Sequence, residues 1–173
     1  MFHQVRHPLN VILSRANSGA LGERFIDAHT PVVQVSPQNG GRNQQEHKRN
    51  QKLIRATSHW ITWNLHLSRV SDWTYKLEDI DFPEICSRAK LENTNRPCPT
   101  QEIVDRVVQK IQRKNLTNSH LHSLQELGWD ELARLDPLLT EIAMSMAALY
   151  GYNDVPAGVP QHLLPLNLQS GHF

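Results

Sequence analysis

The sequence predicts a mainly α-helical protein, to which a minor two-stranded sheet would add α+β character. Residues 43–70 have the spacing of one long amphipathic helix, and the last third of the chain contains several shorter helical segments. Only two short segments have the composition of strands. We therefore expect the long helix to pack on a C-terminal bundle of short helices.

The size and composition are those of one globular domain. The chain has 173 residues, of which 39% are hydrophobic and 20% charged, and this supplies enough apolar surface for a core. Within that domain we expect an N-terminal α/β part at 1–92, a helical bundle at 99–152 and a proline-containing tail at 153–173. The mean hydropathy of −0.51 and the lack of a long apolar stretch indicate that no segment spans a membrane.

The N-terminal region is expected to contain one helix and one strand. A helix over residues 8–17 would begin with a proline, which suits a first helical turn. Residues 1–22 lack acids and carry Arg6 and Arg15, which is also the composition of an organellar transit peptide, but the ordinary helix is the preferred interpretation. Residues 31–36 are rich in valine and begin with proline, as in a short strand.

The long helix is predicted from the spacing of its apolar residues. The stripe consists of Leu53, Ala56, Trp60, Trp63, Leu67 and Val70. Asn43 is the expected N-cap, with Glu46 three residues later. We expect Trp60 and Trp63 to be buried against the C-terminal bundle, because large aromatic residues on an apolar stripe usually lie in the core. The alternative is a surface of two indoles for a partner or for stacked bases.

The remainder is expected to be one strand followed by helices. Residues 73–77 alternate large and polar side chains, and the strand they predict would pair with residues 32–35. The expected helices cover 83–91, 100–114, 117–127, 130–135 and 137–150. The inward-facing residues are expected to be Ile103, Val104, Val107, Val108 and Ile111 in the second of these helices, and Leu138, Leu139, Ile142, Met146 and Leu149 in the last.

Seven basic residues are the candidates for binding nucleic acid. They are Arg42, Lys48, Arg49, Lys52 and Arg55 at the start of the long helix, and Arg106 and Lys110 in the helix over 100–114. Lys48, Lys52 and Arg55 share one helical face, and the Asn and Gln residues among them can bond phosphate oxygens or base edges. The alternative is a solvated helix end that binds nothing. Arg106 and Lys110 also complement the helix dipole, which explains them without a ligand.

The sequence contains no recognisable metal or catalytic motif. Cys86 and Cys98 are expected to be free thiols in a reducing compartment, and neither has a zinc-ligand spacing with the ten histidines. No metal or cofactor is therefore predicted. Glu78, Asp79 and Asp81 form an acidic cluster, which we interpret as a solvated turn and not as a cation site. Phosphate-binding loops, dinucleotide-binding motifs and nucleophile elbows are all missing.

These observations predict a non-enzymatic, cytoplasmic accessory subunit that contacts RNA or DNA through its basic helix, within an assembly of other protein subunits. The net charge is only +1, so any affinity for nucleic acid must come from a local patch. Two alternatives stay open. One is an adaptor or structural subunit that binds only protein, through its tryptophans and its tail. The other is a small enzyme with an unrecognised Cys/His or acidic site.

Overall fold

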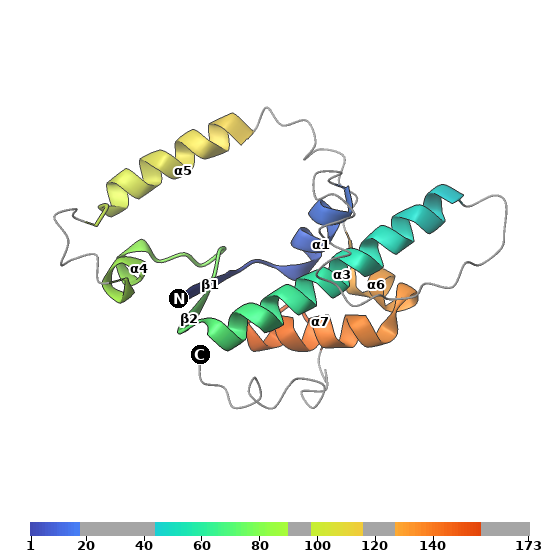
Figure 1. Cartoon of the computed structure of the whole chain (residues 1–173). Coiled ribbons are helices and arrows are strands. Elements are labelled where there is room, and N and C mark those ends of the chain that lie inside the picture. Colours follow the sequence, from blue (N-terminus) through green and yellow to red (C-terminus); the bar gives the residue numbers. More distant parts are fainter. Residues whose placement is uncertain (18–43, 90–97, 116–126, 157–173) are drawn as a thin grey trace. The chain divides into compact units, whose positions relative to one another are not determined.

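The computed structural model describes residues 1–17, 44–89, 98–115 and 127–156, which form six helices and a two-stranded parallel sheet (Figure 1). This confirms the predicted fold class. The chain divides into two units, Met1–Leu77 with Glu126–Phe173, and Glu78–Gln125, and each is described by itself. In the described residues, no helix has both the length and the apolar content needed to cross a membrane.

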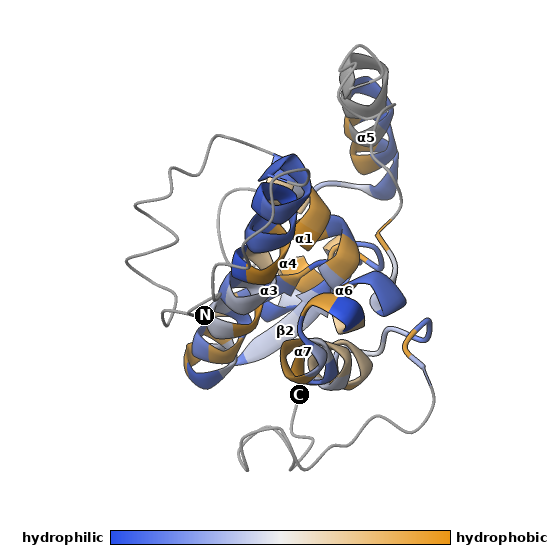
Figure 2. Ribbon diagram, turned by 90° about the vertical axis from the view of Figure 1, so that its right-hand side faces the viewer, coloured by the Kyte–Doolittle hydropathy of each residue, from blue (hydrophilic) through white to orange (hydrophobic). Residues whose placement is uncertain are grey.

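The larger unit is arranged around one long helix, α3 (Gln44–Val70), which has 27 residues. Two helices later in the chain, α6 (Trp129–Leu135) and α7 (Pro137–Leu149), pack on α3, as does α1 (Pro8–Asn17). Hydrophilic and hydrophobic residues alternate in bands along α3 (Figure 2). The predicted packing of the long helix on short C-terminal helices is therefore confirmed within this unit.

The buried face of α3 follows helical spacing. Its buried residues include Leu53, Ala56, Thr57, Trp60, Ile61 and Asn64. Trp60 is only 3% exposed and meets the ring of Tyr150 edge-to-face at 6.3 Å, as predicted. The prediction for Trp63 is wrong, because 42% of this residue is exposed. Three residues turn a helix through about 300°, so Trp63 lies about 60° away from Trp60, where it borders a pocket.

The sheet joins two segments that are distant in the sequence. Strand β1 (Phe2–Val5) pairs in parallel with β2 (Trp73–Lys76), with Phe2 opposite Trp73 and Val5 opposite Lys76. Strand β2 confirms the prediction for residues 73–77, but its observed partner β1 was not predicted. The predicted strand at 31–36, and its pairing with β2, lie outside the described residues.

A buried histidine connects both strands to α3. Asn64 donates its Nδ2–H to the carbonyl oxygen of Trp60 at 2.7 Å, so its Oδ1 must be the atom that faces His3 Nε2 at 2.9 Å. His3 Nε2–H is therefore the donor in that contact, and Nδ1 accepts from the Thr74 hydroxyl at 3.3 Å. This satisfies both ring nitrogens of a neutral imidazole. Burial lowers the pKa of His3, while the Asn64 hydrogen bond acts in the opposite sense.

The C-terminal helices begin and end where the sequence indicates. Asp136 caps α7 by accepting the Leu139 N–H at 3.0 Å, and Pro137 occupies the first turn. Gly151 closes the helix in the left-handed region, at φ +79°. The prediction that Leu138 faces inward is wrong, since it is 58% exposed. The buried face consists of small residues and two larger ones, namely Thr140, Ala143, Ser145, Met146, Ala147 and Tyr150.

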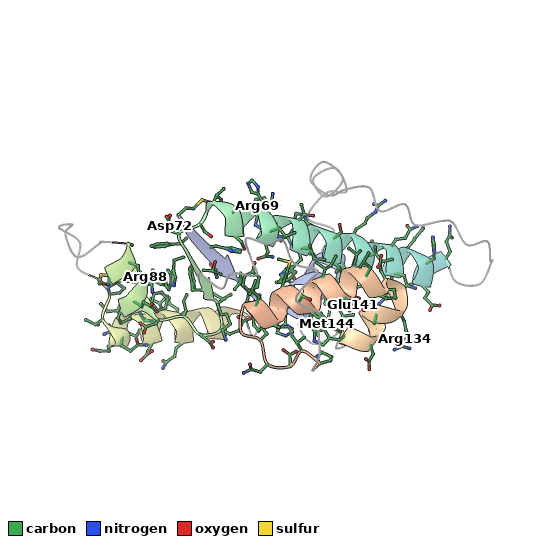
Figure 3. All side chains as sticks on the ribbon, turned by 90° about the horizontal axis from the view of Figure 1, so that it is seen from below. Arg69, Asp72, Arg88, Arg134, Glu141 and Met144 are labelled. Atoms are coloured by element: carbon green, nitrogen blue, oxygen red, sulfur yellow. A yellow bond between two sulfur atoms is a disulfide. The ribbon has the colours of Figure 1, made fainter. Side chains whose placement is uncertain are left out.

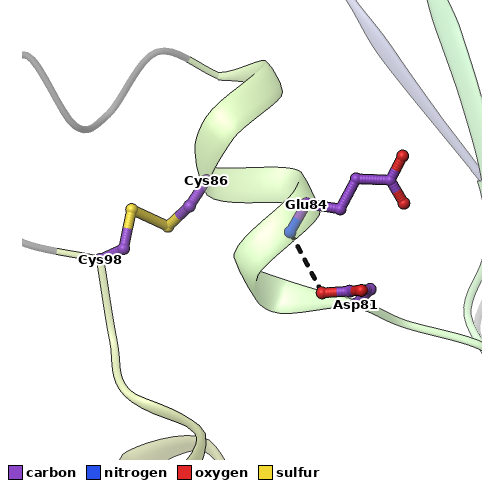
Figure 4. The surroundings of a disulfide bond; sticks show 4 residues. All are labelled: Asp81, Glu84, Cys86 and Cys98. Carbon is purple, nitrogen blue, oxygen red and sulfur yellow. Dashed lines mark hydrogen bonds between the residues drawn. A yellow bond between two sulfur atoms is a disulfide. The ribbon is translucent and has the colours of Figure 1, made fainter.

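The smaller unit contains α4 (Phe82–Arg88) and α5 (Gln101–Asn115), which contact one another. Asp81 caps α4 by accepting the Glu84 N–H at 3.1 Å (Figure 4). On α5, Val104 is buried as predicted, whereas Ile103 and Val107 are about half exposed. The predicted inward face of α5 is therefore only partly covered by described residues.

Cys86 and Cys98 form a disulfide, so the prediction of free thiols is wrong (Figure 4). The two Cα atoms lie 5.9 Å apart, within the range that disulfide geometry requires. Two cysteines alone carry no spacing signal for pairing, which is why the sequence did not indicate the bond. Disulfides persist mainly in oxidising compartments, so the predicted cytoplasmic location no longer has support from reduced thiols.

Several further predictions lie outside the described residues. They are the Asn43 cap, the candidate Arg42, residues 117–126 of the helix predicted over 117–127, and the tail beyond residue 156. The side chains of Val108 and Ile111 are likewise outside the description, although both residues belong to α5.

The buried His3 predicts a pH-dependent stability. Its pKa is lower in the folded chain than in the unfolded chain, so the unfolded chain binds more protons as the pH falls below about 6.5. The free energy of unfolding should therefore decrease through that window. Urea unfolding of the wild type and His3→Gln from pH 8 down to about pH 5 should show a smaller decrease in the variant. His66→Gln, at an exposed position of α3, is the control and should keep the wild-type profile. Equal profiles for wild type and His3→Gln would contradict the assignment.

The disulfide predicts a stability change confined to the smaller unit. A disulfide between residues 12 positions apart lowers the conformational entropy of the unfolded chain, and this stabilises the folded state by about 3 kcal/mol. The four tryptophans, Trp60, Trp63, Trp73 and Trp129, belong to the other unit. Reduction of the disulfide should therefore lower the unfolding temperature of the smaller unit, which far-ultraviolet circular dichroism detects through its helices. The unfolding temperature measured by tryptophan fluorescence should stay unchanged. A titration finding two thiols in the denatured, unreduced protein would contradict the bond.

Candidate functional site

The first nine residues of α3, Gln44–Lys52, lie outside the core and carry three members of the basic cluster, Lys48, Arg49 and Lys52. None of these nine residues is buried, and the first buried residue of the helix is Leu53. Lys48, Lys52 and Arg55 are exposed and share one face of the helix. This part of α3 therefore presents several cationic groups to solvent on a regular backbone.

Arg49 connects the basic cluster to another helix. Its Nη1–H donates to Glu131 Oε1 of α6 at 2.5 Å, and the two side chains are 36% and 29% exposed. This ion pair connects the start of α3 to α6. Arg49 is thus engaged in the fold, while Lys48 and Lys52 on either side of it are exposed.

The other candidates do not extend this surface within the described structure. Arg42 lies outside the described residues. Arg106 and Lys110 are exposed on α5 in the smaller unit, where Arg106 pairs with Glu102 at 2.8 Å one turn earlier. An exposed pair of this kind contributes little to stability. A patch composed of both helices stays a prediction.

A pocket of about 180 Å³ lies farther along α3 in the larger unit. It is lined by Gln4 and Arg6 from the β1 region, by Val11 and Arg15 of α1, and by His59, Trp60, Trp63 and Asn64 of α3. A protein cavity of about 150 Å³ is known to hold a benzene molecule. The pocket is therefore large enough for a small planar group.

The described lining of the pocket carries positively charged side chains. It contains two guanidinium groups, and none of the described lining residues is acidic. Burial lowers the pKa of Arg15, but an arginine keeps its charge at neutral pH. Trp63 lies nearly parallel to His59, with an angle of 29° and ring centroids 6.3 Å apart. The pocket therefore combines positive charge with a partly exposed indole.

Sequence reasoning did not identify Arg6 and Arg15 as site residues. A signal was present, because residues 1–22 contain these two arginines and no acid. The same composition was interpreted as that of an N-terminal helix or a transit peptide. The missing information was the packing of α1 on α3, which brings Arg15 beside His59 and Trp63.

The described residues contain neither a metal-binding cluster nor a free thiol. Among them, no cluster of three or more histidine, cysteine or acidic side chains is placed to hold a metal ion. Both sulfur atoms are used in the disulfide, so neither cysteine supplies a thiolate nucleophile. Asp81 of the acidic cluster serves as the cap of α4.

Comparison with known proteins adds no functional information. No protein-family model matches the chain, and no curated protein or solved structure matches it either. The function must therefore be argued from the geometry of the two features above, the basic start of α3 and the pocket.

Proposed function

We propose that this chain is a non-enzymatic accessory subunit that contacts nucleic acid through the basic start of α3, within a larger assembly. The observation that carries the proposal is the exposure of Lys48, Lys52 and Arg55 on one face of a helix that the core holds from Leu53 onward. Such a face can lie along a sugar-phosphate backbone, because phosphates attract cations independently of base sequence.

The neighbouring side chains support the proposal. Gln44 and Gln45 are exposed, and Asn50 and Gln51 are half-buried beside the lysines. Amides of this kind donate hydrogen bonds to phosphate oxygens and to base edges. The surface therefore combines charge with directional donors, which a purely solvating helix end does not require.

A protein-binding adaptor is the second candidate, and one observation favours it. Ile103 and Val107 of α5 are 47% and 50% exposed, one helical turn apart. An exposed apolar pair on an amphipathic helix is a typical contact for another protein. This feature lies in the smaller unit and is compatible with nucleic-acid binding by the larger one.

The proposal predicts binding that weakens with salt. Each phosphate contact releases counterions, which gives a log–log slope of about −0.9 per phosphate on duplex DNA and about −0.7 on single strands. The triple variant Lys48→Gln, Lys52→Gln and Arg55→Gln should flatten that slope by roughly two to three units. Fluorescence anisotropy with labelled RNA and DNA at several salt concentrations measures it. The variant should keep its circular dichroism, because exposed substitutions usually cost little stability.

Two controls separate this surface from general charge effects. Arg69→Gln removes a charge from the last turn of the same helix, where Figure 3 shows the side chain, and should leave the slope unchanged. The pair Arg106→Gln and Lys110→Gln tests α5, and an equal loss there would indicate a composite patch. If the wild type shows no salt-sensitive binding to any nucleic acid, the proposed function is wrong and the adaptor takes its place.

A further inference from the structure

The basic residues of α3 and the exposed indole share one side of the helix. At 3.6 residues per turn, Lys48, Lys52 and Arg55 lie within about 80° of arc of Trp63. The axial distance from Lys48 to Trp63 is about 22 Å, at 1.5 Å per residue. A strand that follows the cations along this face therefore reaches Trp63 and the pocket beside it.

The pocket has the two chemical features that an unpaired nucleotide requires. Trp63 is 42% exposed and offers an indole surface at the pocket, while Trp60 is almost completely buried. Arg6 and Arg15 supply two positive charges at the same pocket, from the end of β1 and the last turn of α1. Gln4 and Asn64 add polar side chains to the lining.

We propose that the pocket formed by Arg6, Arg15, His59 and Trp63 receives an unpaired base of a single-stranded nucleic acid, stacked on the Trp63 indole, with the adjoining phosphate at the two arginines. This inference rests on the proposed function and specifies its ligand as a single strand. In a duplex, each base is already stacked and paired, so its face is not offered to a side chain. Only a single strand presents a free face, and stacking on aromatic residues tolerates any base.

The geometry also distinguishes the two parts of the surface. The cations at the start of α3 recognise only the backbone, and they serve a duplex and a single strand alike. The pocket adds an interaction that only the single strand can make. The inference therefore predicts a preference for single strands that depends on Trp63 and not on Lys48 or Lys52.

The test compares Trp63→Ala, Trp63→Phe and wild type on a single strand, on the duplex of the same sequence, and on a single strand of equal length without bases. Loss of one stacked base should weaken binding of the single strand roughly five- to 140-fold. Trp63→Phe should retain much of the affinity, because it keeps an aromatic face. Binding of the duplex and of the base-free strand should be the same for all three proteins.

A second measurement tests the arginines. Arg6→Gln should flatten the salt dependence on the single strand by about 0.7 units, whereas Arg69→Gln should leave it unchanged.

The fluorescence of Trp63 should also report the contact with the base directly. The single strand should quench the tryptophan fluorescence of the wild type, and Trp63→Phe should abolish most of that quenching. Circular dichroism and the unfolding temperature of each variant show whether the fold is retained.

The outcomes separate this inference from the proposed function. If Trp63→Ala leaves single-strand affinity unchanged, or weakens the duplex equally, the inference is wrong. The proposed function still stands in that case, provided that the Lys48, Lys52 and Arg55 substitutions flatten the salt dependence. If no nucleic acid binds the wild type, both are wrong. If Trp63→Ala loses its fold, Trp63→Leu replaces it in the comparison, because it keeps an apolar side chain without an aromatic face.

Discussion

The larger unit depends on the buried hydrogen bond between His3 and Asn64. His3 belongs to β1 and is completely buried, Asn64 belongs to the core face of α3, and Thr74 of β2 completes the contacts of the imidazole. The ring also meets Tyr150 edge-to-face at 5.8 Å, just after α7. Four elements therefore converge on one side chain. Because both ring nitrogens have a hydrogen-bond partner, the contact specifies the register of these elements as well as their proximity.

A second set of hydrogen bonds joins the end of α7 to α3 through Ser68. The Ser68 hydroxyl donates to the Asn64 carbonyl at 2.8 Å, so the Tyr150 hydroxyl donates to Ser68 at the same distance. Burial raises the pKa of Tyr150 to about 12, with the Ser68 hydrogen bond acting in the opposite sense, and the phenol stays protonated. The neutral phenol and the Trp60 indole then pack together in the core. The end of α7 is thus fixed to α3 by both a hydrogen bond and aromatic contact.

The elements that local spacing determines were predicted, but of the contacts between distant segments only the packing of α3 on the C-terminal helices was predicted. Leu53, Ala56 and Trp60 indicated α3, and Asp136 with Pro137 indicated the start of α7, because these patterns lie within a few residues of each other. The pairing of β1 with β2 joins residues 71 positions apart. The burial of His3 could not be predicted either, because its partner Asn64 is distant in the sequence. The same division holds for the candidate site. Lys48, Lys52 and Arg55 follow from helical spacing, whereas a pocket from β1, α1 and α3 requires the tertiary fold.

The first nine residues of α3 lie outside the core, and their exposure needs an explanation. A helix segment gains most of its stability from tertiary packing, and Gln44–Lys52 buries no side chain. The one described ion pair that connects this segment to α6, Arg49 with Glu131, is about one-third exposed and therefore worth about 1 kcal/mol or less. The segment thus contributes little to the stability of the fold while it concentrates positive charge on one face. The proposed contact with a polyanion accounts for both the small contribution to stability and the positive charge. Cationic side chains that bind a polyanion must be exposed in the free chain, so they cannot also be buried in the core.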